Sequence, residues 1–175
     1  MKTLILGGVR SGKSRLAQDI AIKSNKPVIY IATATSNDEE MQVRIEQHKS
    51  SRPNNWLVIE EPMQLASTLA KYNQRNSLII IDCLTLWLTN LLLDDDVQTL
   101  DRERTALFEA LQDNANEIIL ISNETGLGIM PLGELTRRFG DEAGITNQLL
   151  ASLCDRVILT VAGLPLTLKG TAYEL

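Results

Sequence analysis

The residues best suited to chemistry in this 175-residue sequence lie within its first fourteen positions. They fit the phosphate-binding pattern G-x-x-x-x-G-K-[ST] and comprise Gly7, Gly8, Val9, Arg10, Ser11, Gly12, Lys13 and Ser14. Glycines let backbone amides converge on phosphate oxygens, while Lys13 would reach the β- and γ-phosphates and Ser14 would hold Mg2+. The segment therefore predicts a nucleoside triphosphate site; the alternative is an ordinary glycine-rich corner between a strand and a helix.

An apolar run that ends in a carboxylate, Leu78–Asp82, supplies a second candidate. This is the form of a Walker B acid, which holds the magnesium ion of such a loop directly or through water. The alternative is that Asp82 caps a helix starting at Leu84. Glu60 and Glu61 end another apolar run. A carboxylate there could accept hydrogen bonds from a ribose or a base, or it could simply be solvated.

His48 is the only histidine, and it lies in a polar segment with Arg44, Lys49 and Arg52. Imidazole is largely neutral at pH 7 and could attack a phosphorus atom of a triphosphate held by these cations. An exposed histidine without a catalytic role is the alternative. Further along, the polar segment 123–128 could orient an acceptor near the γ-phosphate, or it could serve only as a turn.

These candidates need a scaffold, and apolar runs alternate with segments of helical spacing along the whole chain. The alternation predicts parallel strands with crossover helices in three layers, with ligands beyond the carboxyl ends of the strands. The turn at Gly163–Pro165 predicts an antiparallel strand at one edge. We expect strands at Thr3–Leu6, Val28–Ala32, Trp56–Glu60, Leu78–Ile81, Ile118–Ser122, Val157–Val161 and Leu166–Lys169. We expect helices at Lys13–Lys23, Asp38–Lys49, Met63–Tyr72, Leu84–Leu93, Arg102–Asn114 and Gly133–Leu153.

Length and composition predict a single domain over residues 1–175 in the cytoplasm, with no membrane span and no secretory signal. The net charge of −5 argues against nucleic acid as a partner. Through Arg52 the chain carries nine Lys/Arg and five Asp/Glu, or +4, which leaves −9 for the rest. This distribution favours polyanion binding in the first third. Cys83 and Cys154 are expected to be reduced interior thiols.

Taken together, the segments resemble one family almost end to end, the bifunctional adenosylcobinamide kinases/adenosylcobinamide-phosphate guanylyltransferases of cobalamin biosynthesis. The resemblance rests on the motifs Gly7-Gly8-x-Arg10-Ser11-Gly12-Lys13-Ser14, Tyr30-Ile31-Ala32-Thr33, Asp38-Glu39-Glu40-Met41-x-x-Arg44-Ile45-x-x-His48-Lys49-x-x-Arg52-Pro53-x-x-Trp56, Asp82-Cys83-Leu84-Thr85-x-x-x-Thr89-Asn90-Leu91, Ser122-Asn123-Glu124-x-Gly126-x-Gly128-Ile129-x-Pro131 and Phe139-x-Asp141-x-Ala143-Gly144-x-x-Asn147-Gln148. It implies a P-loop NTPase (RecA-like) fold of class α/β and a homotrimer.

The resemblance also implies two reactions. ATP or GTP phosphorylates adenosylcobinamide, and GTP then donates GMP to adenosylcobinamide phosphate, giving adenosylcobinamide-GDP and pyrophosphate. The family uses a guanylylated histidine, which His48 matches. Some relatives carry two adjacent histidines, whereas Gln47 precedes His48 here. If the family nucleophile were the other position, this chain would lack guanylyltransferase activity.

Carried over by motif, the binding residues extend beyond the first loop. The resemblance implies that Gly7 through Ser14 hold the phosphates, and that Ser14 and Asp82 hold Mg2+. The residues implied to contact the guanylyl donor are Thr33, Ala34, Thr35, Lys49, Ser50, Ser51, Arg52 and Glu60. Two other functions remain open: a small-molecule P-loop kinase without nucleotidyl transfer, and a nucleotide-gated binding protein.

Overall fold

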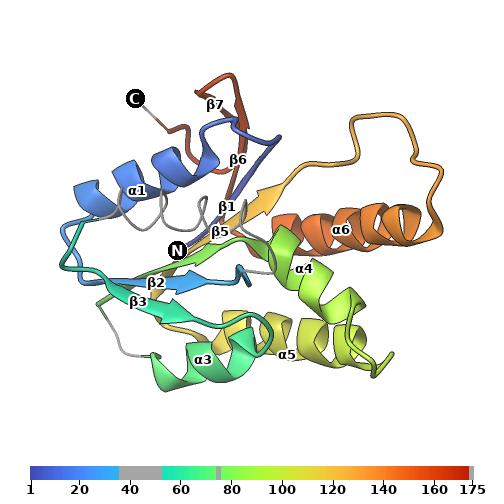
Figure 1. The fold of residues 1–175 in the computed structure, drawn as a ribbon. Helices are drawn as coiled ribbons and strands as arrows, with labels where there is room; N and C mark the ends of the chain where they lie inside the picture. The colour runs from blue at the N-terminus through green and yellow to red at the C-terminus, as the bar shows by residue number, and fades with distance from the viewer. Residues whose placement is uncertain (36–52, 74–75, 174–175) are drawn as a thin grey trace.

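The computed structural model describes residues 1–35, 53–73 and 76–173, which build one seven-stranded sheet (Figure 1). The strands lie in the order β3-β2-β4-β5-β1-β6-β7, and all neighbours pair in parallel except β6 and β7, which are antiparallel. The parallel sheet and its antiparallel edge are thus confirmed. The strand bounds are β1 Lys2–Gly7, β2 Val28–Ala32, β3 Leu57–Glu60, β4 Leu78–Asp82, β5 Glu117–Asn123, β6 Arg156–Val161 and β7 Leu164–Lys169.

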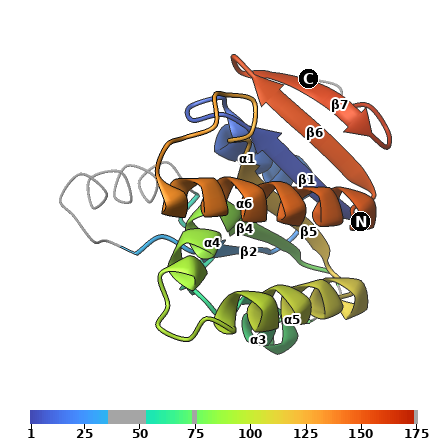
Figure 2. The ribbon, with the colours of Figure 1, turned by 90° about the vertical axis from the view of Figure 1, so that its right-hand side faces the viewer.

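Helices cover both faces of the sheet, which confirms the three predicted layers. Helix α1 lies on one face, and α3, α4, α5 and α6 lie on the other (Figures 1 and 2). None of the described helices has both the length and the apolar character needed to cross a bilayer. The helix bounds are α1 Lys13–Lys23, α3 Leu65–Lys71, α4 Leu84–Leu92, α5 Thr99–Asp113 and α6 Glu134–Leu153.

The middle positions of the central strands form continuous, mostly apolar runs because both faces of these strands are covered. In β4, the side chains of Ile79 and Ile81 enter the core beneath α3–α6, whereas those of Leu78 and Ile80 enter the core beneath α1. This alternation follows from the two-residue period of a strand. The edge strand β3 is different, since Leu57 is exposed there.

The predicted elements agree with the structure to within a few residues at each end. The strand at Val28–Ala32 and the helix at Lys13–Lys23 have the predicted bounds. The helix predicted from Met63 begins at Leu65 instead, because the carboxylate of Glu61 accepts hydrogen bonds from the amides of Met63 and Gln64 at 2.9 and 2.7 Å. The helix predicted over residues 38–49 lies outside the described residues.

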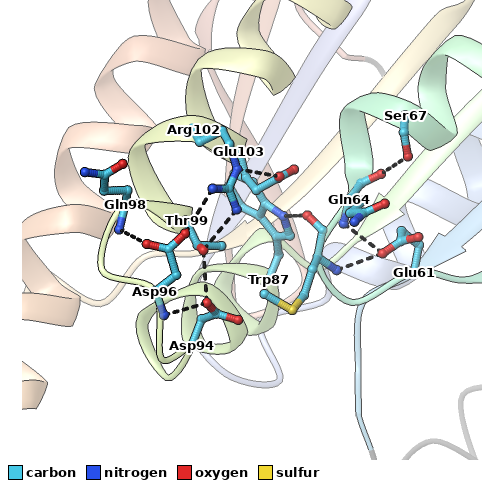
Figure 3. A network of polar contacts seen from close by, with 11 residues as sticks. Glu61, Gln64, Ser67, Trp87, Asp94, Asp96, Gln98, Thr99, Arg102 and Glu103 are labelled. Carbon is cyan, nitrogen blue, oxygen red and sulfur yellow. Dashed lines mark hydrogen bonds and ion pairs between the residues drawn. The ribbon is translucent and has the colours of Figure 1, made fainter.

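Helix α5, in contrast, begins earlier than predicted, at Thr99 rather than Arg102, after a turn held by side-chain bonds (Figure 3). The Asp94 carboxylate accepts hydrogen bonds from the amide of Asp96 and the hydroxyl of Thr99. The Asp96 carboxylate in turn accepts bonds from the Gln98 amide and the Arg102 guanidinium. These bonds hold the turn that leads into α5, although its N-cap residue Gln98 makes no side-chain capping bond. The acidic run before α5 therefore has a structural use.

Both cysteines are free thiols. Cys154 is buried and Cys83 is partly buried. Burial raises the pKa of the Cys83 thiol to about 11 and that of Cys154 to about 12. Both side chains therefore remain protonated at neutral pH and behave as small apolar groups.

Leu107 of α5 is 0% exposed in the larger core. We expect Leu107→Ala to lower the free energy of unfolding by about 3 kcal/mol, because it removes buried methyl groups and leaves a cavity. Leu93→Ala provides the matched control, since Leu93 is 61% exposed and should change stability by less than about 0.5 kcal/mol. Urea titration followed by circular dichroism measures both; equal effects would contradict the assignment of the core.

Candidate active site

The phosphate-binding loop lies at the carboxyl edge of the sheet, between Gly7 at the end of β1 and Lys13 at the start of α1. Its outer residues Gly8, Val9 and Arg10 are exposed. The residue preceding the helix, Gly12, has φ of 100° and provides no side-chain cap. The first amides of α1 are therefore free of a capping side chain, and a helix start of this kind attracts anions.

Lys13 is turned back into the loop. Its side chain is 7% exposed, and Nζ donates a hydrogen bond to the carbonyl of Gly8 at 2.6 Å and approaches Oγ of Ser11 at 3.5 Å. Burial lowers the pKa of the Lys13 ammonium, against the opposing charge of Asp82. Negative phosphate oxygens in the loop would offset this desolvation, since an opposite charge favours the charged form.

The end of β6 and the turn between β6 and β7 pack against the loop. Oγ1 of Thr160 donates to the carbonyl of Leu6 at 3.0 Å and lies 2.9 Å from Oγ of Ser11. The amide of Gly163 donates to the carbonyl of Ser11 at 2.9 Å. A Cβ added at Gly12 would approach Cα of Gly163 to 3.2 Å. A side chain at Gly12 would therefore press on the backbone of the turn, in addition to the strain of a positive φ.

Ser14 at the start of α1 meets Asp82 at the end of β4, although β5 lies between β4 and β1, the strand that precedes α1. Oγ of Ser14 donates to Oδ2 of Asp82 at 2.9 Å, because α1 crosses the face of the sheet from β1 toward β4. Together they form an all-oxygen pair of a hydroxyl and a carboxylate. Mg2+ prefers oxygen ligands and is commonly held by one or two carboxylates, water and substrate phosphates. The donor set therefore fits a magnesium ion that arrives with a nucleotide.

The next part of the edge is formed by residues following β2 and β3. Thr33 is buried, and its hydroxyl accepts a bond from the Cys83 amide at 2.8 Å and donates to the Cys83 carbonyl at 2.7 Å. Asn90 of α4 donates to the carbonyls of Thr33 and Pro62, both at 3.0 Å. These bonds link β2, β3 and β4, so the Thr33 hydroxyl is used by the scaffold.

The other residues predicted on this edge are more accessible. Ala34 and Thr35 are half-buried, and Thr35 Oγ1 lies 3.4 Å from Oδ1 of Asn90. Glu60 is exposed at the end of β3. The carboxylate of its neighbour Glu61 accepts hydrogen bonds from the backbone amides of Met63 and Gln64, just before α3.

The segment after β5 begins beside the phosphate-binding loop. The amide of Glu124 donates to the carbonyl of Gly7 at 3.0 Å, and the amide of Asn123 donates to Oγ1 of Thr85 at 2.8 Å. The Glu124 carboxylate accepts a bond from the Gly126 amide at 2.7 Å. This segment is therefore placed where an acceptor could approach the loop, and its glutamate also closes a turn.

The structure thus brings Gly7 through Ser14, Thr33, Ala34, Thr35, Glu60 and Asp82 to one edge of the sheet. The remaining predicted site residues, His48, Lys49, Ser50, Ser51 and Arg52, lie outside the described residues. Sequence reasoning missed Tyr30, Thr160 and Asn90, whose side chains bond to residues of the site. Each is a polar residue within or beside an apolar element, and that is the signal that could have found them.

The sequence matches a known protein family over most of its length. Residues 3–168 match the model of the cobinamide kinase / cobinamide phosphate guanyltransferase family. The chain is 56% identical over 170 residues to the bifunctional adenosylcobalamin biosynthesis protein CobP of Pseudomonas aeruginosa, covering 97% of this chain and 98% of that protein. It is 36% identical over 182 residues to the bifunctional adenosylcobalamin biosynthesis protein CobU of Escherichia coli, covering 97% and 100%.

The fold is also found in a protein of low sequence identity. A solved structure from Pyrococcus horikoshii OT3 superimposes with a TM-score of 0.61 at 10% identity, covering 98% of this chain and 87% of that one. Together with the strand order, this likeness supports the predicted α/β fold with a mostly parallel sheet.

Gly7 and Gly8 differ sharply in the space around them. A Cβ at Gly7, which has φ of 153°, would come within 2.5 Å of Ser11 Oγ and of the backbone and side-chain oxygens of Thr160, whereas a Cβ at Gly8 would meet nothing within 4 Å. We expect Gly7→Ala to lower the free energy of unfolding by about 2 kcal/mol or more, because backbone atoms must move. Gly8→Ala should change it by less than about 0.5 kcal/mol. Denaturant unfolding compares the two; equal stability would contradict the described packing of the loop.

Proposed function

The chain belongs to the cobinamide kinase / cobinamide phosphate guanyltransferase family, and on that basis we propose that it carries out both reactions. It phosphorylates adenosylcobinamide with ATP or GTP, and it then transfers GMP from GTP to adenosylcobinamide phosphate. The products are adenosylcobinamide-GDP and pyrophosphate. The observation that carries the proposal is the family match over residues 3–168, joined to a phosphate-binding loop whose Ser14 meets Asp82 at 2.9 Å.

The kinase step requires positioning and charge neutralisation. The hydroxyl of the aminopropanol arm attacks the γ-phosphorus, the bond to the β–γ bridging oxygen breaks, and the nucleoside diphosphate leaves as the hydroxyl proton is lost. Backbone amides of the loop and the ammonium of Lys13 stabilise the charge on the transferring phosphoryl group. Residues after β5 lie beside Gly7, and we assign them to orienting the acceptor.

Mg2+ would be held by Ser14 and Asp82 together with the phosphates. When bound, it would neutralise phosphate charge and favour departure of the diphosphate. Ser14 and Asp82 would determine the position of the ion, because the Ser14 hydroxyl and the Asp82 carboxylate are already in contact. The fit of this donor set is the support for magnesium as the cofactor.

The guanylyl step breaks a different bond. A ring nitrogen of His48 attacks the α-phosphorus of GTP, a P–N bond forms, and pyrophosphate leaves. An oxygen of adenosylcobinamide phosphate then attacks the same phosphorus, the P–N bond breaks, and the imidazole is restored. Because the guanylyl group is first held by His48, pyrophosphate can leave before adenosylcobinamide phosphate accepts the group. We assign Thr33, Ala34, Thr35, Lys49, Ser50, Ser51, Arg52 and Glu60 to the guanylyl donor, as the family motifs imply.

The assembly and location follow from the same family membership. We infer a homotrimer working in the cytoplasm, where GTP and ATP are available, with the corrinoid as the acceptor. The net charge of −5 argues against nucleic acid as a partner and agrees with small-molecule substrates.

Labelled GTP separates this function from its two rivals. Incubation with α-labelled GTP should leave an acid-labile, base-stable label on the protein, whereas γ-labelled GTP should label the corrinoid product and the released pyrophosphate but not the protein. Transfer of γ-label alone would identify a kinase without nucleotidyl transfer. Tight nucleotide binding with no acceptor-dependent product would identify a binding protein. Mass spectrometry after GTP treatment should locate GMP on His48.

Replacement of Lys13 should disable the kinase step. We expect Lys13→Ala to lower kinase turnover by several orders of magnitude, because it removes the buried cation that stabilises the β- and γ-phosphates. Lys23→Ala is the matched control, since Lys23 lies at the opposite end of α1 and its ammonium contacts Tyr173. Formation of adenosylcobinamide phosphate measures both. Near-normal turnover of Lys13→Ala would contradict the role of the loop.

Replacement of His48 should separate the two activities. We expect His48→Ala to abolish GMP transfer and protein guanylylation while substantial kinase activity remains, because the kinase step uses no covalent histidine. Gln47→Ala serves as the neighbouring control and should keep both activities. Separate assays of adenosylcobinamide phosphate and adenosylcobinamide-GDP measure the split, and equal loss of both products in His48→Ala would exclude a nucleophilic role.

A further inference from the structure

Tyr30 of β2 is a buried tyrosine whose hydroxyl reaches the carboxylate assigned to magnesium. Only 1% of its surface is exposed, and Oη donates a hydrogen bond to Oδ2 of Asp82 at 2.5 Å. Oγ of Ser14 donates to the same oxygen at 2.9 Å. Hydrogen bonds from hydroxyls to an ionised carboxylate are short and roughly twice as strong as neutral ones. The carboxylate is therefore held from two sides, by the loop and by β2.

The register of the sheet explains how Tyr30 reaches this carboxylate. Strands β2 and β4 are parallel neighbours, in which Ala32 lies opposite Asp82 and Tyr30 lies opposite Ile80. Tyr30 is two residues before Ala32, so its side chain shares the α1 face of the sheet with that of Ile80. The long side chain then spans one pleat toward the carboxyl edge, where its hydroxyl meets Asp82.

The aromatic ring of Tyr30 is itself held in place. It stacks on the ring of Trp56, with centroids 6.2 Å apart and planes 26° from parallel, and Trp56 is buried in the same core. A fixed ring fixes the direction of its hydroxyl. A phenylalanine would fill the same apolar space without burying a hydroxyl, which is costly unless the hydroxyl is bonded.

From this geometry we infer that Tyr30 is a positioning residue for the magnesium–nucleotide complex, acting through Asp82. The inference rests on the proposed use of Ser14 and Asp82 for Mg2+. The hydroxyls of Ser14 and Tyr30 both donate to Oδ2 of Asp82, and no hydrogen bond from another described residue reaches Oδ1. Oδ1 is therefore the oxygen that we assign to holding the ion or its water. Tyr30 keeps the carboxylate in that orientation before the nucleotide arrives, so binding requires no reorientation of Asp82.

The test measures coupling between magnesium and nucleotide rather than turnover alone. Binding of a fluorescent ATP analogue is titrated with Mg2+ and with EDTA, for the wild-type chain and for Tyr30→Phe. We expect metal-free affinity to remain within about twofold, while the gain in affinity caused by Mg2+ falls about tenfold, as loss of one charge-assisted hydrogen bond implies. Electron paramagnetic resonance of Mn2+ should show a matching loss of metal binding in the nucleotide complex.

Three further variants separate positioning from packing. Tyr173→Phe is the matched control, because Tyr173 packs against the same core but its hydroxyl bonds to Lys23; it should leave the magnesium effect unchanged. Asp82→Asn should reduce the magnesium effect by itself. If Tyr30 acts through Asp82, the double variant Tyr30→Phe/Asp82→Asn should lose little more than Asp82→Asn alone.

The outcomes distinguish this inference from the proposed function. An unchanged magnesium effect in Tyr30→Phe, an equal loss of metal-free and metal-bound affinity, or additive losses in the double variant would each overturn it. A wild-type chain whose ATP affinity does not depend on Mg2+ would overturn it as well. A wild-type chain that binds Mg2+ and ATP but does not phosphorylate adenosylcobinamide would instead overturn the proposed function, and the binding data would still decide the role of Tyr30.

Discussion

The hydrogen bond between Ser14 and Asp82 is the contact on which the architecture of the site depends. It joins the first helical turn after β1 to the end of β4, across a sheet in which β5 lies between those strands. It can form only if α1 crosses the sheet at the observed position and both strands end at the same edge. Parallel pairing of β1 with β5 and of β5 with β4 brings about the second condition.

The loop before Ser14 depends on a different constraint, which is close packing of backbone against backbone. The β6–β7 turn donates a hydrogen bond to the loop through Gly163, and Thr160 fills the space beside Gly7. Residues almost at the end of the sequence therefore shape a loop almost at its beginning. This packing favours anion binding by the free amides of the loop. If the ligand had to order the loop, the entropy lost on ordering would lower the affinity.

Buried polar side chains extend this rigidity along the carboxyl edge. Thr33 bonds both backbone groups of Cys83, and Asn90 bonds the carbonyls that follow β2 and β3. Such bonds satisfy backbone groups that the strands leave unpaired where they end. The same edge then carries Ala34, Thr35 and Glu60, so the residues assigned to the nucleotide stand on a bonded scaffold rather than on an unsupported loop.

Local patterns in the sequence were sufficient for the phosphate-binding loop, for the strand ending at Asp82, and for the alternation of elements that gives a parallel sheet, because each depends on residues close together in the chain. The predicted starts of α3 and α5 were wrong. The side chains of Glu61, Asp94 and Asp96 bind backbone amides before these helices, and the spacing of apolar residues does not report such bonds. The partners of Asp82 were decided only by the fold. Tyr30 reaches Asp82 only because β2 lies beside β4 in the observed register. Strand order and register arise from packing over the whole sheet, so short stretches of sequence do not reveal them.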